Sequence, residues 1–344
     1  MSVPYESDSA PYESAPGPYA SENRRKPPDD VDDLGPRAGR VHISARRLGA
    51  DATTLGSLAL RSPQVLMGLA VVFVVSYAAD ALFGPPWWIP LGLWVVSGGL
   101  TFHRPCERLL ARWLYRLRYP TQEEERKLTA VWLQVTARAG VDADAFQLWV
   151  EDSDEINAMA AAGHIVGVTS HSLRTLSPGR LAGVLAHELG HHAGGHAWAS
   201  LLTFWYTLPA RIAWRLLRWL AGRVDRLSVG VAAVVIGVLG AAAFALATAT
   251  YGLVLLPLAT PYLVAAVSRR SELRADEHAA GLGFAQQLMT VLREDLDHAE
   301  HARAGAPALN VRSEKEGVIA RLLASHPDVH TRLHHLQAHL ESGR

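Results

Sequence analysis

Two histidines and a glutamate stand in metal-ligand spacing in the stretch His187-Glu188-Leu189-Gly190-His191. Histidines four positions apart lie on one face of a helix, where both imidazoles can bind a single metal ion. Glu188 then lies beside the open coordination position and can take a proton from a bound water. The alternative is a histidine-rich helix end that interacts favourably with the helix dipole. Ser177-Pro178 predicts the start of an apolar helix that runs into the motif, so we favour the metal site.

A catalytic zinc site needs a third protein ligand. The astacin and matrix-protease pattern would place a histidine at position 197, which is alanine, so that subclass is disfavoured. The neighbouring His192 and His196 are expected to be exposed or to support the ligands.

A better source of the third ligand is the acidic segment 268–276, where Glu272 and Asp276 share a helical face. Glu272 could bind the metal while Asp276 accepts the N–H of a metal-bound histidine. Charge patterning alone favours a different interpretation, a solvated helix that pairs both acids with Arg269, Arg270 and Arg274.

The two motifs together resemble the membrane zinc peptidases of the HtpX heat-shock protease and CAAX prenyl endopeptidase family. In that family, an H-E-x-x-H helix is followed by an S-R-x-x-E-x-x-A-D helix whose glutamate is the third ligand. SRRSELRAD, residues 268–276, contains every fixed position of that pattern. The resemblance covers about residues 60–340 and reverses the interpretation of the acidic segment. It implies one Zn²⁺ held by His187, His191 and Glu272, with Asp276 orienting a ligand.

Two further segments match the same family. Asn157-Ala158 stands in the stretch that resembles the family's edge strand, which holds substrate backbone by strand addition, so both residues are expected to bind substrate. Ser325-His326-Pro327, followed by Arg332, resembles the family's S-H-P tail. The resemblance implies that His326 lies near the metal, where it could steady the oxyanion or occupy the metal in a latent state. A solvated helix face remains the alternative for His326.

The first apolar part of the chain predicts a transmembrane hairpin over residues 62–102. It is free of charge except for Asp80, and Pro85-Pro86 predicts a turn near its middle. Arginines cluster on both outer flanks, which places both ends of the hairpin on the cytoplasmic side. The alternative, two buried helices of a soluble core, is disfavoured because neither run has a polar face.

The second apolar part, residues 227–268, contains no charge and no histidine and is about twice as long as one span requires. We therefore expect a second hairpin there, with a single span as the alternative. Residues 199–226 are expected to form an amphipathic interfacial helix, or else a third span. Either arrangement puts an even number of crossings between His191 and Glu272, as a shared metal site requires.

The remaining segments belong to a peptidase domain in two parts, residues 103–198 and 269–344. A helix is predicted over 121–139, and strands over 146–150 and 164–169. Residues 1–40 contain three imperfect Pro-Tyr repeats and predict a disordered leader.

Composition excludes other classes of protein. Acidic and basic residues balance at 33 each, so nothing indicates a nucleic-acid partner. The single cysteine, Cys106, excludes an internal disulfide framework and any cysteine-rich zinc module.

The fold predicted is mostly α with a small β-sheet, a gluzincin-like integral membrane zinc metallopeptidase with about four transmembrane helices. Its expected partners are protein or peptide substrates and the lipid bilayer. The predicted location is the cell membrane, with the active site on the cytoplasmic side. Glu188 is the predicted general base, which takes a proton from the metal-bound water. The predicted substrates of the enzyme are misfolded or membrane proteins. A CAAX-type protease for prenylated C-termini and a non-catalytic zinc-binding membrane scaffold remain the alternatives.

Overall fold

The computed structural model describes residues 50–222, 256–304 and 327–342, together with the single positions 230, 233 and 237. The predicted leader, most of the 227–268 segment and His326 lie outside the described residues. The described helices are α1 (Ala52–Phe83), α2 (Trp88–Ser97), α3 (Arg104–Leu114), α4 (Gln122–Ala139), α5 (Ser170–Thr175), α6 (Pro178–Ala193), α7 (His196–Ala221), α9 (Leu256–Gly281), α10 (Ala285–Ala304) and α12 (Val329–Ser342), with 3-10 turns at Gly98–Phe102 and Ala143–Ala145. The strands are β1 (Leu117–Arg118), β2 (Gln147–Glu151), β3 (Ala158–Ala161) and β4 (Ile165–Thr169). The prediction of a mostly helical fold with a small sheet is confirmed.

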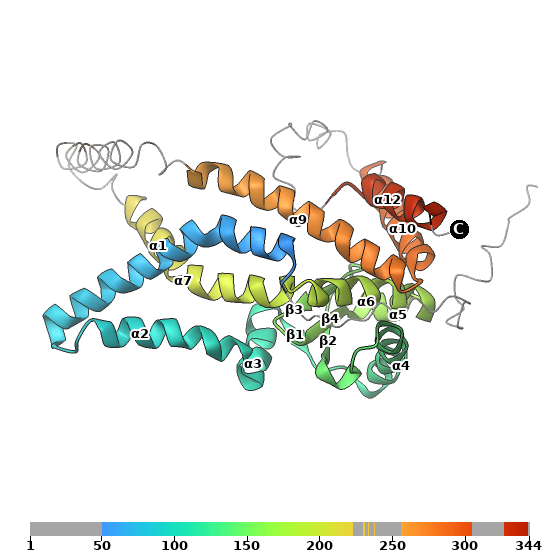
Figure 1. The fold of residues 1–344 in the computed structure, drawn as a ribbon, viewed down its shortest axis with the longest axis horizontal. Helices are drawn as coiled ribbons and strands as arrows, with labels where there is room; N and C mark the ends of the chain where they lie inside the picture. The colour runs from blue at the N-terminus through green and yellow to red at the C-terminus, as the bar shows by residue number, and fades with distance from the viewer. Residues whose placement is uncertain are drawn as a thin grey trace, which may run out of the picture.

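The first apolar segment forms two helices, α1 and α2, joined by a turn after Gly84 (Figure 1). Gly84 adopts a positive φ of 80°, which lets its N–H close the last turn of α1. Of the described residues, only α1 has the length and hydropathy of a membrane span, because the apolar stretch Trp88–Phe102 is shorter. Within the most apolar 18-residue stretch of α1, only 11% of the residues are buried by the rest of the structure. This low burial argues against two buried helices of a soluble core. That both helices cross a membrane stays a prediction.

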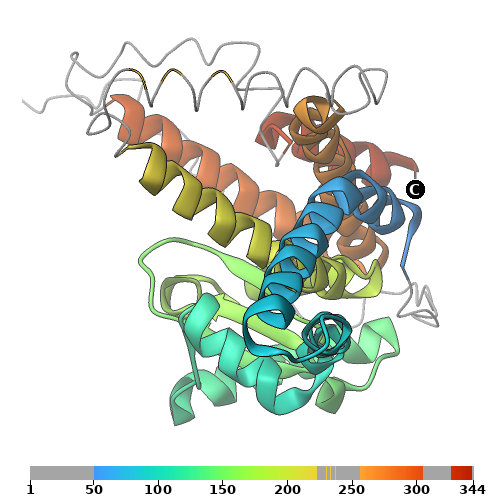
Figure 2. The ribbon, with the colours of Figure 1, turned by 90° about the vertical axis from the view of Figure 1, so that its left-hand side faces the viewer.

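Helix α7 packs against α1, and the two helices cross at an angle in both views of the ribbon (Figures 1 and 2). Gly68 of α1 lies directly against the backbone of Tyr206, where a Cβ would collide with the Tyr206 carbonyl. The Tyr206 hydroxyl donates to the Val95 carbonyl at 2.6 Å, and Trp205 stacks on Trp94 of α2. This packing places α7 beside the hairpin, as the third-span alternative requires, and the number of crossings stays a prediction.

Helix α9 connects the second apolar segment directly to the acidic motif. It continues without interruption through Pro261, although a proline inside a helix removes one backbone hydrogen bond. Glu272 and Asp276 therefore lie on the same helix as residues 260–268 of the apolar segment, and α9 packs against both α1 and α6.

The sheet has the strand order β1-β2-β4-β3. Strands β2 and β4 are parallel, with Gln147 opposite Ile165, while β1 and β3 pair antiparallel to their neighbours. β4 is fully buried and β3 is an edge strand, as predicted for the segment after Asn157. One side of β3 is therefore free among the described strands to pair with an added strand.

Helix α6 lies at the centre of the peptidase core. Leu181, Leu185 and Leu189 recur every four residues and are buried, as expected for one face of a helix packed on several neighbours. The helix as a whole contacts α4, α9, α10 and β3. Each buried leucine contributes roughly 1.5–3 kcal/mol, so the helix that carries the His-Glu-His motif is firmly held.

Helix α4 confirms the prediction over 121–139 and begins with a capping box. Thr121 accepts the N–H of Glu124, whose carboxylate accepts the N–H of Thr121. Arg118 donates to the same carboxylate at 2.7 and 2.9 Å. These bonds from Arg118, followed by the bond from Thr121, lower the pKa of Glu124 to about 2.

We expect Glu124→Gln to lower the free energy of unfolding at pH 7 by about 1 kcal/mol. Because the folded-state pKa of Glu124 is depressed, its contribution is complete above about pH 4.5 and is lost as the pH falls through about 2. Thermal unfolding measured between pH 7 and 2 checks this, with Glu123→Gln in the same helical turn as the control. A deficit that persists unchanged at pH 2, or an equal deficit for Glu123→Gln, would contradict the prediction.

Candidate metal centre

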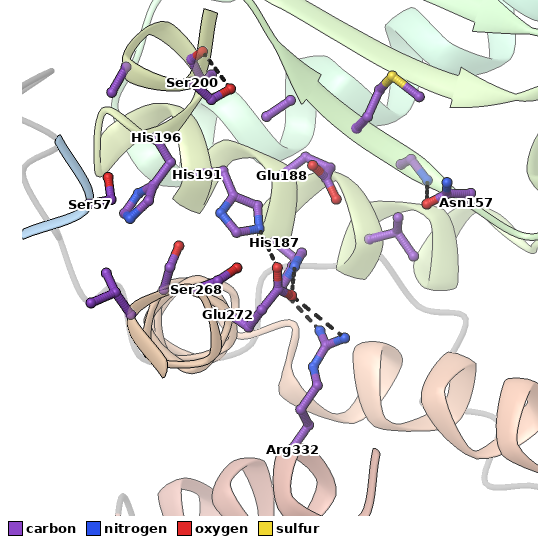
Figure 3. Close-up of a pocket in the computed structure, with 18 of the residues that line it drawn as sticks. Ser57, Asn157, His187, Glu188, His191, His196, Ser200, Ser268, Glu272 and Arg332 are labelled. Carbon is purple, nitrogen blue, oxygen red and sulfur yellow. Dashed lines mark hydrogen bonds and ion pairs between the residues drawn. The ribbon is translucent and has the colours of Figure 1, made fainter. Parts of the chain in front are cut away.

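The His-Glu-His helix and the acidic helix cross at two small residues. A Cβ at Gly190 of α6 would lie only 2.9 Å from the Cα of Ala275 on α9. Because neither residue has a larger side chain, the two helices approach closely. This crossing brings the imidazoles of His187 and His191 to face Glu272, as Figure 3 shows.

The three side chains offer ligand atoms that all lie within 4.8 Å of one another. His187 Nε2 lies 3.5 Å from Glu272 Oε2, and His191 Nε2 lies 3.6 Å from Glu272 Oε1. Ligands about 2.1 Å from a tetrahedral zinc ion are separated by about 3.4 Å. The donor atoms and their spacing therefore fit a bound metal ion. That these three residues hold zinc, as the family resemblance implies, stays a prediction.

Asp276 and Arg332 support His187 from behind. Asp276 is completely buried, and its Oδ1 lies 2.8 Å from His187 Nδ1. Arg332 of α12 binds both oxygens of Asp276, at 2.6 and 2.8 Å. If His187 Nδ1 carries the proton that Asp276 accepts, its Nε2 is left as a lone-pair donor toward Glu272.

The alternative that paired Asp276 with the arginines of its own helix is therefore not what the structure shows. Arg332 lies 56 positions further along the chain and takes that place, while Arg274 pairs with Asp51 at 2.6 Å. Asp276 is a buried group rather than a solvated one.

The electrostatics of the site favour a positive charge between its carboxylates. Burial alone would lower the pKa of His187, but its hydrogen bonds to Asp276 and Glu272 raise it to about 9. Burial, aided by the charge of His187, lowers the pKa of His191 to about 3. Burial raises the pKa of the Glu188 carboxyl, with the charge of His187 acting in the opposite sense. A divalent cation at the three ligand atoms would take the place of the proton on His187 Nε2 and balance the charge of the buried carboxylates.

A cleft of about 480 Å³ opens beside the three ligand residues. Glu188 lines it from α6, and Asn157 and Ala158 line it from the start of edge strand β3. The Asn157 backbone N–H donates to Ser172 Oγ at 2.9 Å, which fixes the entry to the strand. The predicted substrate-binding residues, the predicted base and the ligand group thus share one cavity.

Peptidase family M48 matches this chain over residues 122–340, which is more than half of its length and includes both motifs. The chain belongs to peptidase family M48. It is also similar to a protein named Protease HtpX homolog from Methylacidiphilum infernorum (isolate V4), with 27% identity over 252 residues, which is 66% of this chain and 79% of that protein. The family predicted from the paired motifs is confirmed, and this chain is a metallopeptidase.

His192 and His196, which follow the motif in this M48 peptidase, do not join the ligand group. His192 was expected to be exposed or to support the ligands, but it is buried, and its Nε2 lies 3.0 Å from the Ile165 carbonyl on β4. His196 is half-buried, and its Nε2 lies 3.0 Å from Thr53 Oγ1 at the start of α1. His192 therefore joins α6 to the sheet, and His196 joins α7 to α1.

Asp51 is a residue near the site that the sequence motifs did not indicate. It caps α1 by accepting the Thr54 N–H at 2.7 Å, and its other oxygen binds Arg274 at 2.6 Å. The Asp51 N–H donates to Gly194 at the end of α6. The start of the apolar hairpin is thus joined to both helices that carry the ligands. The capping pattern Asp-x-Thr-Thr predicts the helix start but not its distant partners.

We expect Asp276→Asn to weaken metal binding by about 10–100-fold, because the carboxylate that orients His187 is lost. Competition with a chromophoric chelator measures the change in affinity. Asp297→Asn on α10, at an exposed position that does not line the cleft, is the matched control. Unchanged affinity in Asp276→Asn would show that the His187–Asp276 bond does not orient a ligand.

Proposed function

We propose that this M48 metallopeptidase is a zinc-dependent endopeptidase of the cell membrane that cleaves misfolded or membrane proteins at the cytoplasmic face. The observation that carries the proposal is the buried group of His187, His191 and Glu272 with Glu188 lining the same cleft. Two imidazoles and one carboxylate with a position left for water form a ligand set typical of catalytic zinc.

When bound, zinc would polarise the scissile carbonyl and lower the pKa of a water molecule toward neutrality. Glu188 is placed to accept the proton of the attacking water and to donate it to the leaving amine. Its burial raises its pKa, which suits a group that must hold the proton between these two transfers. His326, outside the described residues, stays a predicted neighbour of the metal.

The substrate is proposed to bind as an added strand. Edge strand β3 begins at Ala158, directly beside the cleft, and has one neighbour among the described strands, β4. Backbone hydrogen bonds to such an edge hold an extended peptide with little dependence on its sequence. This suits an enzyme that acts on unfolded segments of many proteins.

The proposed membrane placement rests on α1 and on the arginines that flank its hairpin. α1 has the length and hydropathy of a span and leaves most of its apolar surface exposed. The arginines that follow the hairpin, four of them within or next to α3, suit the cytoplasmic side. With a second hairpin over residues 227–268, we propose about four spans, with α7 lying at the inner interface. This arrangement places the cleft just beneath the bilayer. Residues 103–198 and 269–344 would then be two parts of one cytoplasmic domain.

Cleavage of an unfolded, non-prenylated model protein by the detergent-purified chain tests the function. We expect cleavage with zinc, loss of cleavage after chelation, and recovery when zinc is returned. A chain that binds zinc stoichiometrically but cleaves only a prenylated C-terminal peptide would support the CAAX-type alternative. A chain that cleaves neither substrate, yet loses folding stability when zinc is removed, would support the scaffold.

A further inference from the structure

A second cavity of about 700 Å³ lies between α1, α7 and α9, outside the ligand group. Its walls are largely apolar and include Met67, Val71 and Leu217. Its volume is within the range of small-molecule sites. Three of its lining residues also line the catalytic cleft: Arg61, Thr203 and Val264. We call this cavity the α1–α7 groove, and it adjoins the cleft at Arg61.

Two arginines, Arg61 from α1 and Arg211 from α7, line this apolar groove. No carboxylate of the described residues forms an ion pair with either guanidinium. Arg211 lies over the Phe204 ring at 5.2 Å, a contact that holds the side chain but does not neutralise its charge. Two like charges beside apolar surface are unfavourable unless an anion joins them.

The α1–α7 groove opens onto the exposed apolar surface of α1 and α7. Met67, Trp214 and Leu217 on its rim are 60%, 57% and 50% exposed, and they continue the exposed apolar surface of α1. Arg61 is the last charged residue before the charge-free run of α1. In a bilayer this position is at the level of the headgroups, where tryptophan and arginine are common. Inside the groove, the buried amide oxygen of Gln64 has no hydrogen-bond partner among the described residues.

We propose that the α1–α7 groove binds one anionic phospholipid, with its phosphate between Arg61 and Arg211 and its acyl chain along Met67, Val71 and Leu217. This inference rests on the proposed membrane placement. The pair of arginines selects the negative charge, and the apolar wall selects the chain, so neither inorganic phosphate nor a zwitterionic lipid satisfies both. Because Arg61 also lines the cleft, the bound headgroup forms part of the wall that a substrate meets.

Native mass spectrometry of the full chain in an uncharged detergent tests the site. The probes are phosphatidylglycerol, phosphatidylcholine with the same acyl chains, and soluble glycerol 3-phosphate. We expect wild type to retain one phosphatidylglycerol at least tenfold more than phosphatidylcholine, and to bind glycerol 3-phosphate no more than background. Arg61→Gln/Arg211→Gln should lose that selectivity. Arg215→Gln, an exposed arginine on the same helix that does not line the groove, should keep it.

Equal retention of both lipids by wild type, or undiminished selectivity in the double variant, would overturn the proposal. Binding of glycerol 3-phosphate as tight as that of the lipid would show an anion site without a role for the acyl chain, and would also overturn it. Zinc content and thermal unfolding establish that the double variant is folded. Cleavage is measured in the same preparations. Selective lipid binding without cleavage would refute the proposed function but not the lipid site. Cleavage without selective lipid binding would refute the lipid site but not the proposed function.

Discussion

Replacing Glu188 by glutamine is expected to abolish peptide-bond cleavage and to leave the metal bound. The amide keeps the size of the carboxylate and most of its packing, but it cannot accept a proton from water. The loss of a positioned general base typically reduces the rate by about 10²–10⁴-fold. Because Glu188 is not one of the three proposed ligands, the zinc content should remain at one per chain.

The measurement is kcat/KM on the unfolded model protein, made together with zinc content on the same samples. Glu277→Gln is the matched control, because Glu277 lies on α9 near the site but is half-exposed and pairs with His335 at 3.0 Å. It should retain the wild-type rate. A Glu188→Gln variant that cleaves within tenfold of wild type would refute the mechanism. A variant that is inactive because it has lost zinc would instead assign Glu188 a structural role at the metal.

The sequence predicted those elements whose determinants are local. The His-Glu-His helix follows from a capping serine and proline at its start and from apolar residues at helical spacing, and α6 begins at Pro178 as expected. β2 and β4 agree with the predicted strands to within one residue at each end. These features need only short-range preferences, which the sequence displays directly.

The supporting contacts of the site could not be predicted, because they join residues far apart in the chain. Arg332 was noted only as part of a C-terminal resemblance, and its bond to Asp276 depends on how α12 packs against α9. The pairing of Asp51 with Arg274 spans 223 positions. Charge patterning within one helix indicated local partners instead, because it contains no information on which other helix covers the acids.

The close approach of α6 and α9 could not be predicted from the motifs either, although the two small residues that permit it belong to those motifs. Gly190 occupies one of the two variable positions of H-E-x-x-H, and the structure shows that it contacts Ala275 of the second motif. Gly68 likewise permits the contact of α1 with Tyr206. A glycine in an apolar helix predicts a close neighbour in general, but the identity of that neighbour comes only from the fold.

Glu272→Ala is expected to remove the metal and with it all metal-dependent cleavage. Glu272 is the only proposed ligand outside α6, so its loss leaves two imidazoles that share one helix and no third donor. We expect zinc affinity to fall by more than 100-fold, since losing a ligand costs more than losing the group that orients one. Zinc content after gel filtration and competition with a chelator provide the measurement.

Glu277→Ala is the control, because it removes a half-exposed acid five positions along the same helix. If Glu272 were only a solvated acid of an arginine-rich helix, the two variants would bind zinc equally well. That outcome would refute the ligand assignment while leaving the family membership intact. Zinc lost in Glu272→Ala but retained in Glu277→Ala would show that the acidic helix completes the site, because two histidines on α6 alone would not hold the ion. The same result would show that one helix, α9, carries both the end of the second apolar segment and a metal ligand of the peptidase domain.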